Sequence, residues 1–236
     1  MNTGFKEIDT ILKGLKPGSY NLIGARPAMG KTSFALNIAM YVAMVEKKKV
    51  CYFSLDLSKE QLYNHLLLMQ YNTNSTDFCE NFIADTTVFS TVEQLQKTSR
   101  EMQMSHGIDL IIIDDLQFIS RDRGFSRRFR NKSKDGKISK KIKKLAEELQ
   151  IPVILLTNVP RRIERRKNHR PKLADLGRSI KSVCDVLLYI YRDGYYDSDT
   201  EFKDIAEIII AKNKYGDANR TVFLGWDYVH RSFQNM

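Results

Sequence analysis

The stretch Gly24-Ala25-Arg26-Pro27-Ala28-Met29-Gly30-Lys31-Thr32 decides how the rest of the chain is interpreted. An apolar run over Ser19–Gly24 predicts a buried strand before it, and the spacing of apolar residues from Phe34 to Val42 predicts a helix after it. A strand, a tight loop ending in Gly-Lys-Thr and a helix form a phosphate site, because backbone N–H groups and the helix N-terminus face the anion. We therefore expect a nucleotide to contact Arg26, Ala28, Met29, Gly30, Lys31, Thr32 and Ser33.

The chemistry of this loop suggests ATP with Mg²⁺. A lysine in the position of Lys31 reaches the β- and γ-phosphates, and a hydroxyl in the position of Thr32 ligates the metal. The strict motif has glycine where this chain has Ala25, and Gly24 lies one residue earlier. The plain alternative is a structural turn, which the flanking strand and helix disfavour.

Two further carboxylates follow apolar runs that predict buried strands. Asp114 follows Leu110–Ile113 and is the candidate partner of Mg²⁺ through water, although an aspartate here could simply cap a helix. Asp56 follows the strand predicted over Val50–Leu55 and is the candidate base for the attacking water, or else it leads into the helix cap at Ser58.

The remaining pattern predicts an α/β fold with a doubly wound, mainly parallel sheet and helices on both faces. Continuous apolar strands are typical of parallel sheets that are covered on both sides. The last predicted strands, joined by polar turns, would extend one edge of the sheet. We predict one domain over residues 1–236, with strands over 50–55, 82–84, 110–113, 152–156, 186–191, 206–211 and 221–224, and helices over 59–69, 91–104 and 136–149.

Charge points to a polyanionic partner. The formal net charge is +10, and the run Arg121–Lys134 is rich in arginine without apolar periodicity, which predicts a long loop. Its candidate residues for binding a polyanion such as nucleic acid are Arg121, Arg123, Arg127, Arg128, Arg130 and Lys132. A second basic run covers Arg161–Lys167. A merely basic surface is the alternative.

Several classes of protein find no support in the sequence. The three cysteines and four histidines are scattered, so neither a disulfide framework nor a metal site beyond nucleotide-bound Mg²⁺ is predicted. The N-terminus does not have the pattern of a signal peptide, and no apolar run reaches the length of a membrane helix, so we expect no membrane association.

Together these segments resemble the RecA-like motor domain of the DnaB family of replicative DNA helicases. The similar stretches keep the family's order along nearly the whole chain: 3–9, 24–39, 53–62, 113–117, 145–154, 170–176, 191–196 and 206–212. The resemblance implies a RecA-like fold and a ring, a hexamer, with ATP between subunits and single-stranded DNA in the pore. It also implies a primase or helicase loader as candidate partners, and the bacterial cytoplasm, a phage-encoded protein or the plastid stroma as the setting.

The resemblance also assigns the remaining catalytic candidates, and it does so with departures. Asp56 stands where the family has glutamate, and Asn158 stands where the family has a glutamine that senses the γ-phosphate. Lys212 matches a family lysine, and Lys214 stands where the family has an arginine finger. A DNA-contacting loop after Leu176 is shorter than in the family, and the N-terminal collar domain is not in this sequence.

These departures leave three hypotheses open. The first is an ATP-driven helicase motor that moves on single-stranded DNA as a ring. The second is a catalytically weakened relative that acts as a DNA-binding or ring-partner protein. The third is a recombinase-like or clock-protein-like ATPase, which would share the strand-loop-helix order but not the Arg26-Pro27 loop or the segment Tyr191–Tyr196.

Overall fold

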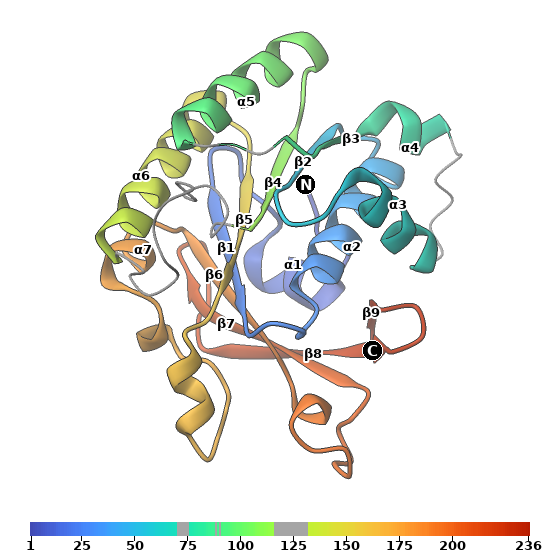
Figure 1. The fold of residues 1–236 in the computed structure, drawn as a ribbon, viewed down its shortest axis with the longest axis vertical. Coiled ribbons are helices and arrows are strands. Elements are labelled where there is room, and N and C mark those ends of the chain that lie inside the picture. Colours follow the sequence, from blue (N-terminus) through green and yellow to red (C-terminus); the bar gives the residue numbers. More distant parts are fainter. Residues whose placement is uncertain (70–75, 88, 90, 116–131) are drawn as a thin grey trace.

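A nine-stranded sheet forms the centre of the molecule (Figure 1). The computed structural model describes residues 1–69, 76–87, 89, 91–115 and 132–236. The strands are β1 Tyr20–Ala25, β2 Val50–Ser54, β3 Phe82–Asp85, β4 Leu110–Asp114, β5 Val153–Asn158, β6 Val186–Arg192, β7 Ile205–Asn213, β8 Arg220–Asp227 and β9 Ser232–Asn235.

The strand order is β3-β2-β4-β5-β1-β6-β7-β8-β9. The first six are mutually parallel, whereas β7, β8 and β9 join by antiparallel pairing. The predicted fold class, a mainly parallel sheet with a strand-rich extension along one edge, is therefore confirmed. Because the parallel strands point the same way, their carboxyl ends all lie along one edge, which we call the C-terminal edge.

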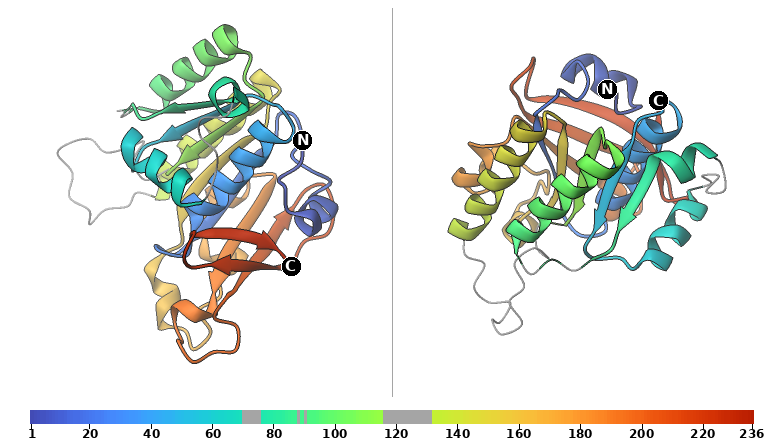
Figure 2. Two further views of the ribbon diagram at one scale, coloured as in Figure 1. Left: turned by 90° about the vertical axis from the view of Figure 1, so that its right-hand side faces the viewer. Right: turned by 90° about the horizontal axis from the view of Figure 1, so that it is seen from above.

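Helices cover both faces of the sheet, as Figures 1 and 2 show. One face packs against α1 Lys6–Leu12, α2 Lys31–Met44, α3 Lys59–Leu68 and α4 Thr76–Asn81. The other packs against α5 Val92–His106, α6 Lys132–Leu149 and α7 Arg178–Lys181. Successive side chains of a strand point to opposite faces of the sheet. Leu22 of β1 therefore packs on the face covered by α5, α6 and α7, and its neighbour Ile23 packs on the face covered by α1 to α4.

Two helix starts follow from the predicted caps. The Ser58 hydroxyl accepts from the backbone N–H of Gln61, and the Gln61 side chain accepts from the Ser58 N–H, so the two residues form a capping box. Thr91 accepts from the N–H of Gln94 in the same way. Ser58 and Thr91 are residue types that favour the first position of a helix, so the sequence predicts both caps and the structure confirms them.

The structure moves the start of α6, shifts several other predicted boundaries by one to three residues and adds short elements. Helix α6 begins at Lys132, whereas the sequence predicted a loop as far as Lys134, because the first turn of this helix carries no apolar residue. Helices α1 and α4 and strand β9 are too short to give a periodic signal. The described residues also form the 3-10 helices η2 Arg161–Arg165, η3 Leu173–Asp175 and η4 Asp193–Tyr195.

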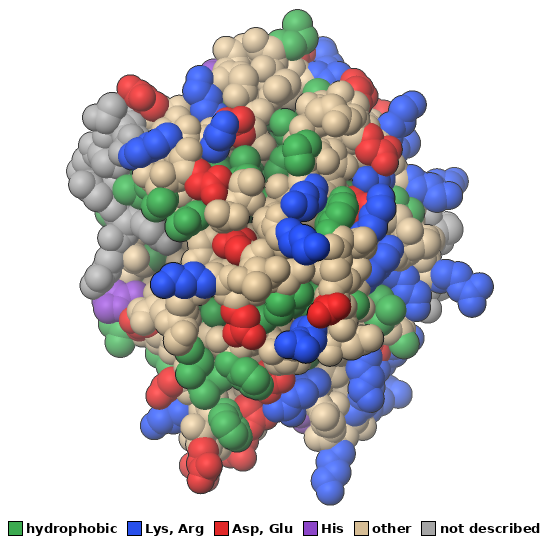
Figure 3. Space-filling model, turned by 180° about the vertical axis from the view of Figure 1, so that it is seen from behind, with side chains coloured by type: hydrophobic (Ala, Val, Ile, Leu, Met, Phe, Trp, Pro, Cys, Tyr) green, Lys and Arg blue, Asp and Glu red, His purple; other side chains and the backbone are tan. Residues whose placement is uncertain are grey.

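Basic side chains gather on the side of the molecule that carries α6 and α7, on the right in Figure 3. The exposed basic residues of these helices and of η2 include Lys137, Lys140, Lys141, Lys144, Arg161, Arg165 and Arg178. None of the helices that the structure describes is long and apolar enough to cross a membrane.

Candidate nucleotide site

The loop between β1 and α2 has the backbone of an anion cradle. Ala28 and Gly30 take positive φ angles of 64° and 93°, and α2 begins directly afterwards at Lys31. No side-chain hydrogen bond from a described residue caps α2 at Gly30, so the N–H groups of the first turn remain available to a ligand. A phosphate is a suitable partner for these donors and for the positive end of the helix dipole.

The ammonium of Lys31 lies over the ends of two neighbouring strands. Its Nζ donates to Oδ1 of Asn158 at 2.6 Å, and Nδ2 of Asn158 donates to Oδ2 of Asp115 at 3.2 Å. Burial lowers the pKa of Lys31 and outweighs the opposite effect of Asp115, Asp114 and Asp56. An arriving phosphate would replace the amide as a stronger partner for this partly buried charge.

A second group of contacts links Thr32 to β4. The Thr32 hydroxyl donates to Oδ2 of Asp114 at 2.7 Å, and the Tyr52 hydroxyl donates to the same oxygen at 2.9 Å. Burial raises the pKa of Asp114 despite both hydrogen bonds. A buried carboxylate that is unfavourable when ionised is well placed to gain from a divalent cation.

This arrangement fits Mg²⁺ bound together with a nucleotide. No group of three or more His, Cys, Asp or Glu side chains among the described residues could hold a metal by itself. Mg²⁺ does not require such a group, because it usually keeps several waters and binds one or two carboxylates plus substrate phosphates. Thr32 and Asp114 would supply that set, and the metal would neutralise phosphate charge.

Asp56 belongs to the same neighbourhood by position and by charge. It follows β2, whose last residue Ser54 pairs with Asp114 in the sheet. Its side chain is exposed, and its charge acts on both Lys31 and Asp114. An exposed carboxylate at this edge can contact water beside the phosphates, which is the requirement for a general base.

Side chains of the carboxyl-terminal strands β6, β8 and β9 pack against the phosphate loop. The Arg192 guanidinium donates to the carbonyl of Ala28 at 2.6 Å and lies 4.1 Å from the ring centroid of Trp226. A Cβ atom on Gly30 would lie 2.9 Å from the Phe233 ring. The loop conformation therefore depends on β6, β8 and β9 as well as on its own sequence.

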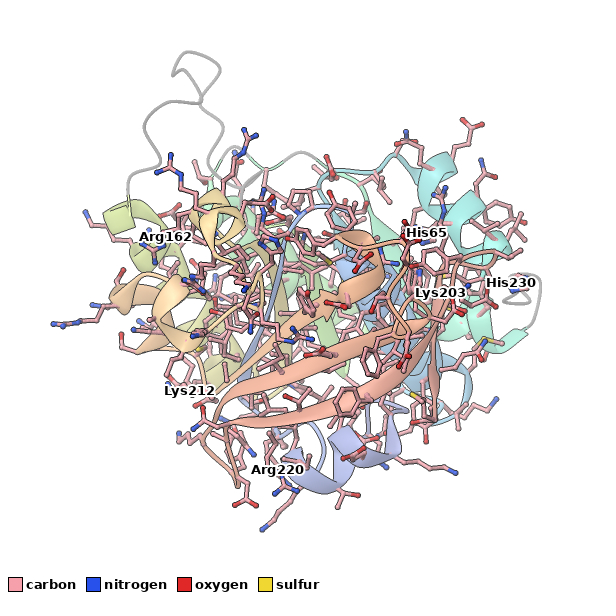
Figure 4. The ribbon with its side chains drawn as sticks, turned by 90° about the horizontal axis from the view of Figure 1, so that it is seen from below. His65, Arg162, Lys203, Lys212, Arg220 and His230 are labelled. Atoms are coloured by element: carbon pink, nitrogen blue, oxygen red, sulfur yellow. The ribbon has the colours of Figure 1, made fainter. Side chains whose placement is uncertain are left out.

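Lys212 and Lys214 lie elsewhere. Lys212 donates to the carbonyls of Lys181 and Cys184, and Nζ of Lys214 lies 3.2 Å from Oδ1 of Asp185. Asp185 precedes β6 and accepts from the N–H of Tyr20, at the start of β1, so this group sits at the edge opposite the phosphate loop. Figure 4 shows Lys212 far from His65, which contacts Ser33 beside the loop.

The candidate DNA-binding residues cannot be placed against this site. Arg121, Arg123, Arg127, Arg128 and Arg130 lie outside the described residues. Lys132 is the first residue of α6 rather than part of a loop.

Sequence reasoning overlooked the partners that complete the site. Tyr52 and His65 gave no signal, since a tyrosine in a buried strand and a histidine in a helix are commonplace. Arg192 did give a sequence signal, because it is a charged residue at the end of an apolar strand, and arginine is rarely buried unless it is paired. Glu164 gave another, as the acidic member of a basic run.

Comparison with known proteins identifies the family. The family model described as "DnaB-like helicase C terminal domain" matches residues 1–88 and 71–235. The chain is 33% identical to the replicative DNA helicase DnaC of Bacillus subtilis (strain 168), over 99% of this chain and 56% of that protein. The chain thus spans about half the length of the curated relatives it matches.

Solved structures agree with this. One described as an ATPase domain superposes with a TM-score of 0.86 at 29% identity, covering 99% of this chain and 90% of that one. A DnaB-like replicative helicase, solved in a study of its interactions with primase, also gives a TM-score of 0.86 at 28% identity, covering 99% of this chain and 63% of that one.

Proposed function

The chain belongs to the family of DnaB-like helicase C-terminal domains, and we propose that it is the ATP-hydrolysing motor of a replicative DNA helicase. The observation that carries the proposal is the junction of Lys31, Thr32 and Asp114 at the C-terminal edge of the sheet, joined through hydrogen bonds to Asn158 and Tyr52. This is the donor set that an Mg²⁺-nucleotide requires.

Each residue has a distinct task in this proposal. Lys31 and the N–H groups of the loop bind phosphate, Thr32 ligates Mg²⁺, and Asp114 holds the ion through water. Asp56 orients and deprotonates the attacking water. Asn158, which already contacts Lys31, senses the γ-phosphate.

A ring completes the site. Lys212 and Lys214 cannot act on the nucleotide of their own chain, because they sit at the other edge of the sheet. We propose that they face the nucleotide of the neighbouring subunit in a homo-oligomeric ring, a hexamer, where Lys214 would stabilise the transferring phosphoryl group.

Single-stranded DNA is the proposed track. The run from Arg121 to Arg130, followed by Lys132, offers positive charge for phosphate contacts, which dominate affinity for single strands. The structure of a DnaB-like helicase with its interactions with primase supports a primase as a candidate partner, and a loader is a further candidate. The bacterial helicases among its relatives support the bacterial cytoplasm as the setting, and we propose residues 1–236 as a single motor domain.

The test is steady-state ATP hydrolysis with and without an oligothymidylate single strand, with Lys31→Ala as the blank. Hydrolysis that DNA stimulates and that the blank abolishes supports the motor. Nucleotide binding without turnover would reject it in favour of a weakened relative. In that case, the triple variant Asp56→Glu, Asn158→Gln, Lys214→Arg should raise turnover strongly.

A further inference from the structure

Helix η2 is a short basic element that begins three residues after Asn158, and contacts with the protein core hold its inner side in place. Ile163 is fully buried in the core beneath it. Nη2 of Arg162 donates to the carbonyl of Ala174 at 3.0 Å, and Arg166 forms an ion pair with the buried carboxylate of Asp175. The helix is therefore a rigid support and not a loosely attached turn.

The outer side of η2 carries unpaired positive charge. Arg161, Arg165 and Lys167 are exposed, and no hydrogen bond or ion pair joins their side chains to any other residue that the structure describes. Residues 161–167 contain five basic side chains and one acidic side chain. Neighbouring cations without an anionic partner repel one another, and binding of a polyanion reduces that repulsion.

The one acidic residue, Glu164, faces the phosphate loop. Its Oε1 lies 2.6 Å from Nε of Arg26 and accepts from the Tyr196 hydroxyl at 3.2 Å. Nη1 of Arg26 donates to the carbonyl of Val159 at 2.9 Å. The hydrogen bond from Arg26 lowers the pKa of Glu164, so its carboxylate is ionised at neutral pH.

The backbone of Arg26 is part of the phosphate loop, and its side chain binds Glu164 of η2. It lies two residues before Ala28 in that loop, and only 16% of its side chain is exposed. In a 3-10 helix, residues three apart lie on the same face, so Arg161 lies over Glu164. An anion bound to Arg161 therefore acts on the helix face that holds Arg26.

We propose that Glu164 is a positioning residue that couples single-stranded DNA on the exposed basic face of η2 to the phosphate loop through Arg26. The inference rests on the proposed function and adds η2 as a DNA contact surface to the run Arg121–Arg130 that the proposed function already uses. DNA phosphates on Arg161 and Arg165 fix η2, and the Glu164–Arg26 pair carries that constraint to the loop that binds ATP.

The test measures coupling directly. The affinity of the full chain for a fluorescent, non-hydrolysable ATP analogue is measured with and without saturating oligothymidylate, and the ratio is the coupling factor. A coupled pair of ligands commonly changes each other's affinity by about 5-fold or more. We expect Glu164→Gln to bring this factor close to one while DNA affinity stays within about twofold of wild type, because a carboxylate that is already paired with Arg26 is not a ligand for DNA phosphates.

Two further sets of variants separate coupling from a purely structural role. Arg26→Gln should lose the coupling as Glu164→Gln does, and the double variant should lose no more than either single one, because the pair acts as a unit. Glu201→Gln, an exposed acidic residue elsewhere, is the matched control and should keep the wild-type factor.

The surface itself is tested by Arg161→Gln with Arg165→Gln. DNA affinity should fall several-fold, and the slope of log affinity against log salt should shrink by about 0.7 for each DNA phosphate that is no longer neutralised. Lys203→Gln with Arg220→Gln removes two exposed cations that Figure 4 shows away from Arg162, and this control should change neither value.

Two results would overturn the inference alone: wild-type coupling in Glu164→Gln, or wild-type DNA affinity and salt slope in the η2 double variant. A wild-type chain that binds nucleotide but no single-stranded DNA would overturn the proposed function, and this inference with it.

Discussion

Replacing Gly30 by alanine tests whether the carboxyl-terminal strands shape the phosphate loop. Gly30 has φ 93°, and an added Cβ would lie 2.9 Å from Cζ of Phe233 and 3.1 Å from Cζ3 of Trp226. The left-handed conformation costs a residue with a Cβ about 1–2 kcal/mol. Forcing a methyl group into packed rings adds about 1–3 kcal/mol. We expect Gly30→Ala to lower the free energy of unfolding by about 2–5 kcal/mol.

Gly107→Ala is the matched control, because it carries the backbone strain without the clash. Gly107 ends α5 with φ 65°, and nothing lies within 4 Å of its added Cβ. Urea unfolding of the nucleotide-free protein, followed by circular dichroism, should place Gly30→Ala about 1–3 kcal/mol below Gly107→Ala. Only Gly30→Ala should also lose affinity for an ATP analogue.

Equal unfolding free energies for the two alanine variants would refute the reasoning. A second test changes Phe233, whose ring the added methyl group would displace. Phe233→Leu replaces that ring with a smaller side chain that lacks the clashing atoms, so Gly30→Ala should cost about 1 kcal/mol less in the Phe233→Leu background than in wild type. An unchanged cost would mean that the clash is not what destabilises the loop.

Three more outcomes follow from the charges and the core. Burial raises the pKa of Asp114 in the fold above its unfolded value of about 3.9, so the ionised carboxylate destabilises the fold above that raised pKa. Asp114→Asn should therefore stabilise the nucleotide-free fold at pH 7 by about 0.5–2 kcal/mol, while Mg²⁺-nucleotide binding is lost. This advantage should shrink as pH falls through the raised pKa and be gone by about pH 4. Burial alone would raise the pKa of Asp185, but hydrogen bonds from Lys143 and other donors lower it, so its contribution is present above about pH 4 and lost as pH falls further. Asp185→Asn should therefore lower the urea midpoint at pH 7, by about 1–3 kcal/mol in free energy, with the difference vanishing in acid. Ile163→Ala should cost about 2–5 kcal/mol in the same assay, because it empties the core beneath η2.

Much of the fold was predictable because its signals are local. Leu110–Ile113 and Val153–Leu156 are continuous apolar runs, and such runs belong to strands that are buried on both faces. The spatial order of the strands was not predictable in this way. β1 lies between β5 and β6, and no pattern within Tyr20–Ala25 states which strands become its neighbours.

The same division applies to the site. Lys31 and Thr32 were predicted from the loop that joins a strand to a helix, and Asp114 because it ends a buried strand. The carboxyl ends of parallel strands meet at one edge, which brings the three residues together. Tyr52 and Phe233 were not, because their contacts with the site depend on the pairing of β2 with β4 and of β8 with β9. Local sequence predicts the chemistry of the site, whereas the sheet order determines what supports it.

The geometry at Asp185 bears on how Lys214 could serve a neighbouring subunit. Along β1, the five residue steps from Tyr20 to Ala25 span about 17 Å at about 3.3 Å per residue, so Lys214 cannot reach the phosphate loop of its own chain. Its side chain is 62% exposed, whereas the Asp185 side chain that it contacts is only 4% exposed. An ion pair with such an exposed partner contributes about 0–1 kcal/mol. Asp185 would still accept from Lys143 and from the Tyr20 N–H after Lys214 leaves, so release exposes no unpaired buried charge. Lys214 could therefore leave Asp185 at little energetic cost, and in the proposed ring it would exchange this carboxylate for a phosphate of the neighbouring subunit's nucleotide.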